Sequence, residues 1–147
     1  MPDGMREHRV RLASDPLRLR EARRWLVRLV LAAAFAPEDA HALAVAFGEA
    51  CANVHRHSYG GRRDGRLDLR VAFGDDRVVV TLDHDGRPFE PSSYVAPDLR
   101  RPSESGYGLY LITALVDDVS FTETEAGGRV VLVKRKRPAR VRVQAEG

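Results

Sequence analysis

The chain has 147 residues, of which 44% are hydrophobic and 31% charged, and its formal net charge is +3. This length and balance are typical of one globular domain and exclude a disordered or fibrous chain. The single cysteine, Cys51, excludes an internal disulfide, and no apolar run approaches the ~20 residues that a membrane helix needs. Because the N-terminus also lacks a signal-peptide pattern, we expect a cytoplasmic protein.

The first half of the chain predicts one strand followed by two helices. Alternation over 9–12 predicts the strand, and Ser14-Asp15-Pro16 predicts a helix start, with a capping oxygen before a proline. Apolar residues then recur at helical spacing as far as Phe35, namely Leu17, Trp25, Leu26, Leu29, Val30 and Ala33. A second helix over about 37–57 carries the stripe Ala42, Leu43, Ala46, Phe47, Ala50, Cys51 and Val54, and Gly60-Gly61 ends it.

In the second half of the chain, apolar residues recur at every second position. Two alternating runs, 67–71 and 78–82, flank Gly74-Asp75-Asp76 and predict a hairpin. A loop rich in Pro and Ser over 86–105 precedes a short helix at about 107–115, and two strands near 119–121 and 130–133 flank Gly127-Gly128. This order predicts an α+β fold, a two-layer sandwich with helices on one face of a mostly antiparallel, mixed sheet. The other face must be polar or covered by a partner.

The last strand runs into the basic stretch Lys134-Arg135-Lys136-Arg137. We therefore divide the chain into one domain over 1–137 and a basic C-terminal tail over 138–147. A basic stretch is compatible with nucleic-acid binding, but the other charges are well mixed along the chain. A solvated strand end is the simpler interpretation, so no direct DNA binding is expected.

Polar side chains interrupt the apolar stripe of the second helix. Glu49 and Asn53 are four residues apart and share a face, with His57 one turn further on. An Asn carbonyl oxygen is a suitable Mg²⁺ ligand beside phosphates, and a neighbouring carboxylate can accept the proton of an attacking hydroxyl. The alternative is a solvated helix face.

Two further segments have polar or glycine-rich patterns. Asp83-His84-Asp85-Gly86-Arg87 follows a strand, where a carboxylate can accept a hydrogen bond from an adenine amino group; the alternative is a plain acidic turn. Ser105-Gly106-Tyr107-Gly108-Leu109 opens a helix, where backbone N–H groups can approach phosphates; the alternative is an ordinary glycine-rich helix entry.

In this order, the three patterns resemble the N, G1 and G2 boxes of the GHKL ATPase superfamily. Thr124 followed by Gly127-Gly128 is similar to the closing signature of that superfamily. The stretches 44–53 and 106–109 most resemble the RsbW-type anti-sigma-factor serine kinases. The resemblance extends over about residues 10–136 and agrees in the order and spacing of several motifs.

The resemblance implies the Bergerat ATP-binding fold with ATP and Mg²⁺ as cofactors. It implies that Glu49 is the general base and Asn53 the Mg²⁺ ligand. The nucleotide-binding residues that it implies are Asn53, His57, His84, Asp85, Gly86, Gly106, Gly108, Leu109 and Thr124. The implied function is to sequester a sigma factor and to phosphorylate a serine of a STAS-type anti-anti-sigma protein, with a homodimer as the assembly and no membrane partner.

His84 is a departure from the family pattern, which has Asp at this position, two residues before the first glycine. It favours an alternative function, a non-catalytic binding module that sequesters a sigma factor or STAS protein without turnover. A third alternative, a sensor histidine kinase fragment, is disfavoured because no dimerisation helix with a phospho-acceptor His precedes the domain.

Overall fold

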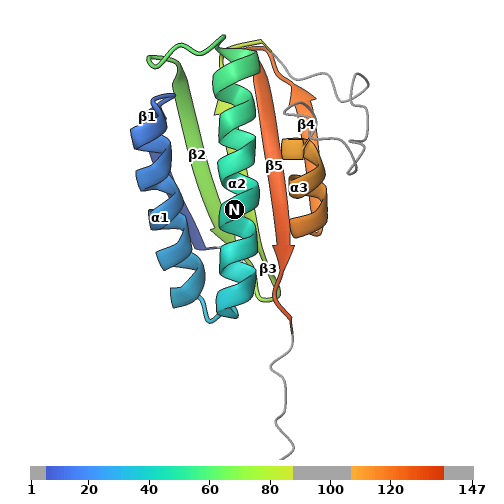
Figure 1. Cartoon of the computed structure of the whole chain (residues 1–147). Helices are drawn as coiled ribbons and strands as arrows, with labels where there is room; N and C mark the ends of the chain where they lie inside the picture. The colour runs from blue at the N-terminus through green and yellow to red at the C-terminus, as the bar shows by residue number, and fades with distance from the viewer. Residues whose placement is uncertain (1–5, 88–106, 138–147) are drawn as a thin grey trace, which may run out of the picture.

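The computed structural model describes residues 6–87 and 107–137, in which three α-helices cover one face of a five-stranded sheet (Figure 1). The elements are β1 (Arg6–Ala13), α1 (Pro16–Ala32), α2 (Pro37–Asn53), a π-helical turn (Val54–Ser58), β2 (Arg66–Phe73), β3 (Arg77–His84), α3 (Tyr107–Leu115), β4 (Asp118–Glu123) and β5 (Gly128–Arg135). The predicted α+β sandwich is confirmed. The strand order is β1-β2-β3-β5-β4, and no parallel pair, which a mixed sheet would contain, occurs among the described strands.

Helix α1 begins as its sequence predicts but buries a different set of residues in its first turns. The Asp15 carboxylate accepts a hydrogen bond from the Leu17 N–H at 3.0 Å, with Pro16 as the first helical residue. Leu17, the first residue of the predicted apolar rhythm, does not face the core, because its side chain is 63% exposed. The face toward the sheet is instead formed by Leu19, Ala22, Leu26 and Val30.

Helix α2 packs on α1 and α3 and carries the centre of the core. Phe47, Leu43 and Cys51 are at most 1% exposed. The prediction of one α-helix to His57 differs from the structure, because the α-helix ends at Asn53 and a single π-helical turn follows. In that turn the Tyr59 N–H bonds to the Val54 carbonyl, five residues back, and His57 is exposed. Gly60 and Gly61, both with positive φ, end the segment as predicted.

The sheet face opposite the helices is lined by ion pairs. Asp68 on β2 is paired with Arg11 on β1 and with Arg66, each at 2.9 Å, and Asp83 on β3 with Arg129 on β5 at 2.6 Å. The face is therefore polar, which was one of the two predicted alternatives. Among the described residues, none of the helices has both the length and the apolar character needed to cross a bilayer. The predicted tail, 138–147, lies outside the described residues.

Candidate functional site

Polar groups of α2 meet the first turn of α3. A Cβ atom built on Gly108 would lie 2.9 Å from Oε2 of Glu49 and 3.6 Å from Oδ1 of Asn53. Asn53 is only 8% exposed, whereas Glu49 is partly open to solvent. The α3 N-terminus, which attracts anions through its free N–H groups, thus lies beside a carboxylate and an amide oxygen. Glycine at 108 is what permits this close approach.

Other predicted residues of this region lie in different surroundings. Leu109 is 8% exposed and belongs to the apolar packing under α3. His57 is exposed on the π-helical turn rather than stacked on Asn53. Gly106 lies outside the described residues. Nucleotide contacts of His57, Gly106 and Leu109 stay predictions.

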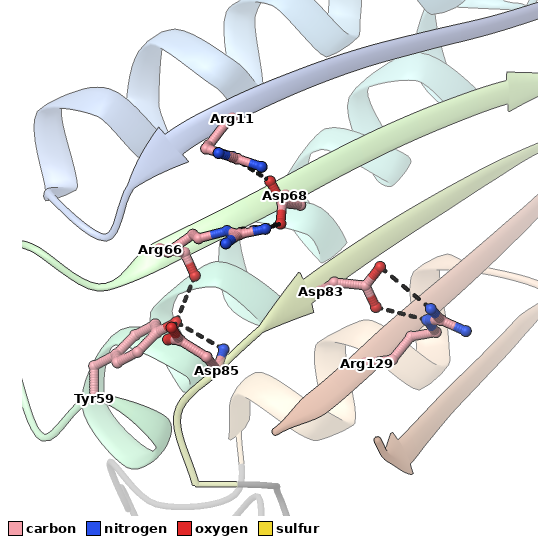
Figure 2. Close-up of polar contacts among 7 residues, drawn as sticks. All are labelled: Arg11, Tyr59, Arg66, Asp68, Asp83, Asp85 and Arg129. Carbon is pink, nitrogen blue, oxygen red and sulfur yellow. Dashed lines mark hydrogen bonds and ion pairs between the residues drawn. The ribbon is translucent and has the colours of Figure 1, made fainter. Parts of the chain in front are cut away.

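The three consecutive polar residues at the end of β3 point in different directions. Asp83 lies on the open sheet face and pairs with Arg129, and Asp85 lies beside the hydroxyl of Tyr59, as Figure 2 shows. His84 points the other way, beneath the helices, because it follows Leu82 at period two on the core side. It is 5% exposed and lines a pocket with Asn53, Val54 and other residues, including Ala50, Ser58, Phe121 and Val130.

Within this pocket the imidazole of His84 has an unsatisfied polar atom. Its Nδ1 is buried and has no hydrogen-bond partner among the described residues. Burial lowers the pKa of His84, although the charges of Asp83 and Asp85 oppose that shift. The side chain is therefore neutral at neutral pH. A buried polar atom without a partner calls for one, and a water molecule or a bound ligand can supply it.

Glycines let the loop after β3 pack tightly between two other turns. A Cβ atom on Gly86 would collide with the Ser58 carbonyl group, which also accepts a hydrogen bond from the Arg87 N–H at 2.9 Å. A Cβ atom on Gly127 would lie 2.5 Å from the His84 carbonyl oxygen. The Thr124 hydroxyl accepts a hydrogen bond from the Gly127 N–H at 3.1 Å and so closes the β4–β5 turn, in which Gly127 lies against this loop. A nucleotide contact of Thr124 stays a prediction.

Tyr59 and Phe121 belong to this region but had no assigned role in the sequence. The Tyr59 hydroxyl lies 2.7 Å from the Asp85 carboxylate and beside the Arg66 carbonyl oxygen, and it accepts a hydrogen bond from the Asp85 N–H at 3.0 Å (Figure 2). Burial, reinforced by the Asp85 carboxylate, raises the pKa of Tyr59 to about 12. Sequence reasoning could have found Tyr59 because a buried tyrosine hydroxyl needs a hydrogen-bond partner. It could have found Phe121 because this residue continues the alternation of a strand.

Replacing Tyr59 with Phe is expected to lower the free energy of unfolding by about 1–2 kcal/mol, because the Asp85 carboxylate and N–H both lose a partner. Urea unfolding followed by circular dichroism measures the change. Tyr110→Phe, at a side chain that is 39% exposed, is the matched control and should change stability by less than about 0.5 kcal/mol. Equal stability of the Tyr59 variant and the wild type would show that this hydroxyl does not hold the loop.

Comparisons with known proteins agree with this architecture. Residues 12–134 match the model of the histidine kinase-like ATPase domain family. The serine-protein kinases RsbW of Bacillus cereus strain G9842 and Bacillus mycoides strain KBAB4 are each 31% identical over 125 residues, which cover 75% of this chain and 75% of theirs.

A solved structure gives the same fold at lower sequence identity. The crystal structure of the RsbU and RsbW domains of a Mycobacterium tuberculosis protein superposes with a TM-score of 0.67 at 19% identity, over 92% of this chain. The chain spans 34% of that longer polypeptide. From the family match and the Bacillus relatives, the chain belongs to the histidine kinase-like ATPase domain family, as an RsbW-type member.

Proposed function

We propose that this chain is an ATP-dependent protein-serine kinase that also acts as an anti-sigma factor, sequestering a sigma factor and phosphorylating a serine of a STAS-type antagonist. The observation that carries the proposal is the meeting of Glu49, Asn53 and the α3 N-terminus at Gly108. Phosphoryl transfer with Mg²⁺ uses a carboxylate that accepts a proton, an oxygen that binds the metal, and N–H groups that bind phosphate, and these three groups meet here. The serine-protein kinase names of the relatives support the same reaction class.

Each of these groups would have a separate task. Asn53 would hold Mg²⁺ through Oδ1, and the N–H groups at the start of α3 would bind phosphate oxygens. Glu49 would accept the proton of the substrate serine hydroxyl as its oxygen attacks. When bound, Mg-ATP would supply the phosphoryl group, and the metal would neutralise the charge that develops on it.

Calorimetric titration of the purified chain with ATP, with and without Mg²⁺, tests the proposal. We expect binding that requires the metal, followed by transfer of radiolabelled phosphate to a STAS-type protein. No binding of nucleotide under either condition would contradict the kinase function. A homodimer and a cytoplasmic location complete the proposal, and light scattering during size-exclusion chromatography tests the dimer.

A second candidate function, sequestration without turnover, is favoured by one observation. The position where relatives of this type have Asp is taken by His84, which is buried and neutral. The two candidates differ in two results: a pure binding module captures a sigma factor equally well with and without Mg-ATP, and it transfers no phosphate.

Replacing His84 with Asp is expected to tighten ATP binding about tenfold. A carboxylate forms a charge-assisted hydrogen bond with an adenine amino group, which is stronger than a neutral one by about 1.4 kcal/mol. In the wild type only the neutral imidazole can accept that bond. Since burial lowers the pKa of His84 from 6.5, affinity should hold from about pH 8 down to at least about 6.5 and fall only as the pH drops through the lowered pKa.

Equilibrium binding between about pH 5 and 8 measures this effect in the wild type and in His84→Asp. Asp83, Asp85 and Arg129 are the charged groups around His84, and all three remain unchanged in the variant. An unchanged affinity in His84→Asp would show that His84 does not contact the base.

Replacing both Arg20 and Arg24 of α1 with Glu, which reverses their charge, is expected to weaken sigma-factor binding at least tenfold. Both residues are exposed on a helix that also carries Arg18, Arg23 and Arg28, a density of positive charge that fits an acidic partner. The matched control is Arg77→Glu with Arg135→Glu, two register partners on the opposite sheet face. If both double variants bind the sigma factor as tightly as the wild type does, α1 is only a solvated helix.

A further inference from the structure

The outer side of β1 is an unpaired edge of the sheet. β1 comes first in the strand order, and its eight residues, Arg6–Ala13, pair along their whole length with β2. Among the described strands, none lies on its other side (Figure 1). Because the N–H and C=O groups of successive strand residues point alternately to the two sides, about half of those of β1 face this edge. Such an edge is a template for a further strand.

A groove lies between this edge and helix α1. Its volume is about 640 Å³, within the range of about 300–1,000 Å³ that is usual for binding sites. The apolar lining consists of Val10 on β1 with Ala22 and Trp25 on α1. Val10 points to the helix side of the sheet, because its register partner is the core residue Leu69, yet it is 38% exposed. The helix therefore leaves the apolar face of the sheet uncovered at this edge.

Arginines surround the apolar lining. Arg9 and Arg11, the edge arginines, alternate with Val10 along β1 and so point to the opposite face of the sheet. Arg18 and Arg28 come from α1. Glu21 is the one acidic residue that lines the groove, so four arginines against one glutamate leave a formal charge of +3. This charge complements an acidic partner.

The present partners of these arginines are easily replaced. Three of the four arginines form an ion pair with a nearby carboxylate, namely Arg9 with Glu7, Arg11 with Asp68 and Arg18 with Glu21. The arginine side chains of these pairs are 62–71% exposed, and exposed ion pairs contribute little to stability. The fourth, Arg28, has no carboxylate within ion-pair distance among the described residues. A carboxylate of a partner can therefore take the place of the present one or add to a free charge.

We propose that this groove binds an extended, acidic segment of a partner protein, which adds to the sheet as a strand beside β1. In such a strand successive side chains point to opposite faces. Apolar side chains would pack on Val10 and Trp25, and the alternate side chains, carboxylates, would reach the edge arginines. Main-chain hydrogen bonds to β1 would supply affinity, and the arginines would select an acidic segment over a basic one.

The groove is separate from the surfaces assigned above. Glu49, Asn53 and Gly108 do not line it, so the proposal goes beyond the kinase function and does not depend on it. Arg20 and Arg24, the exposed residues of α1 assigned to the sigma factor, do not line it either. Loss of strand binding at the groove would therefore leave nucleotide binding unchanged.

Fluorescence anisotropy with a labelled eight-residue peptide, in which Val and Glu alternate, tests the proposal on the purified chain. The peptide has the length of β1. We expect saturable binding to the wild type and at least tenfold weaker binding to Val10→Asp, because a carboxylate in the apolar lining repels the acidic strand. Tyr110→Asp is the matched control, since Tyr110 is 39% exposed and lies on α3, and it should bind the peptide as the wild type does.

The double variant Arg9→Ala with Arg11→Ala decides the question if Val10→Asp does not fold by circular dichroism. Both side chains are exposed, so their loss should spare the fold. It should weaken peptide binding at least tenfold and abolish most of its dependence on salt. Unchanged binding of the peptide by this variant would overturn the proposal, as would failure of the wild type to bind the peptide.

Two N-methylated peptides separate strand addition from simple charge attraction. Methyl groups on the Val nitrogens and on the Glu nitrogens remove N–H groups from opposite edges of the strand. Only one of these edges can face β1, so one methylated peptide should bind at least tenfold more weakly and the other about as tightly as the unmodified peptide. Equal affinities of the two would overturn strand addition.

Two further results would also overturn the proposal. A peptide of the same composition, with four Val followed by four Glu, should bind at least tenfold more weakly, and equal binding would show that the arginines attract any acidic chain. Light scattering during size-exclusion chromatography reports self-association in the wild type and in Val10→Asp. Self-association that this substitution abolishes would assign the β1 edge to a second copy of the chain instead of a partner.

Discussion

Replacing Glu49 with Gln is expected to reduce phosphoryl transfer to the antagonist protein about 10²–10⁴-fold, the usual contribution of a general base. The side chain is partly exposed, and its Oε2 lies where it would touch a Cβ atom at Gly108, so it faces the α3 N-terminus where phosphates would bind. Gln keeps the shape of the side chain but cannot accept the serine proton at neutral pH. Transfer of radiolabelled phosphate under single-turnover conditions measures the loss.

Two further measurements separate a catalytic defect from a general one. Nucleotide affinity and sigma-factor capture should stay within about threefold of wild type, because the proposed base acts only in the transfer step. Glu125→Gln, at an exposed position in the β4–β5 turn, is the matched control and should transfer phosphate normally. If Glu49→Gln transfers phosphate at the wild-type rate, Glu49 has no part in the mechanism.

Local sequence patterns predicted the helices and strands well where buried residues recur at a regular spacing along the chain. Helix α3 occupies 107–115 as predicted, and β2 and β3 extend the predicted alternating runs by one or two residues at each end. Leu17 shows the limit of this reasoning, because an apolar residue in the first turn can fit the helical rhythm and still face solvent. The π-helical turn after Asn53 could not be predicted, because one extra residue per turn leaves no mark in the spacing of a short segment.

The candidate site could be predicted in part for a similar reason. The i,i+4 spacing of Glu49 and Asn53 follows from helix geometry, and strand alternation predicts that Asp83 and His84 face opposite sides, which the structure confirms. The position of Asp85 could not be predicted, because it lies beyond the last strand residue and its direction is set by Tyr59, 26 residues earlier. Long-range polar contacts of this kind have no periodic signal in the sequence.

Replacing Asn53 with Ala is expected to weaken Mg-ATP binding about 10–100-fold, the range that changes at metal-site residues commonly produce. The residue is 8% exposed at the last turn of α2, with Oδ1 turned toward Gly108, and a hard cation beside phosphates requires an oxygen ligand. Ala removes that oxygen while preserving helix propensity. The residual affinity of the variant should therefore depend less on Mg²⁺ than that of the wild type.

Calorimetric titrations with ATP, with Mg²⁺ and with EDTA, give the two affinities whose ratio reports the role of the metal. Asn53→Asp restores an oxygen ligand and should recover most of the metal dependence, whereas a purely structural role would leave both variants equally impaired. Urea unfolding identifies any general loss of stability, since a buried amide also contributes hydrogen bonds to the fold. An Asn53→Ala variant whose affinity still rises with Mg²⁺ as much as that of the wild type would show that the ion is held by other groups. Because Glu49 lies one turn earlier on the same helix face, that result would also weaken its assignment as the base.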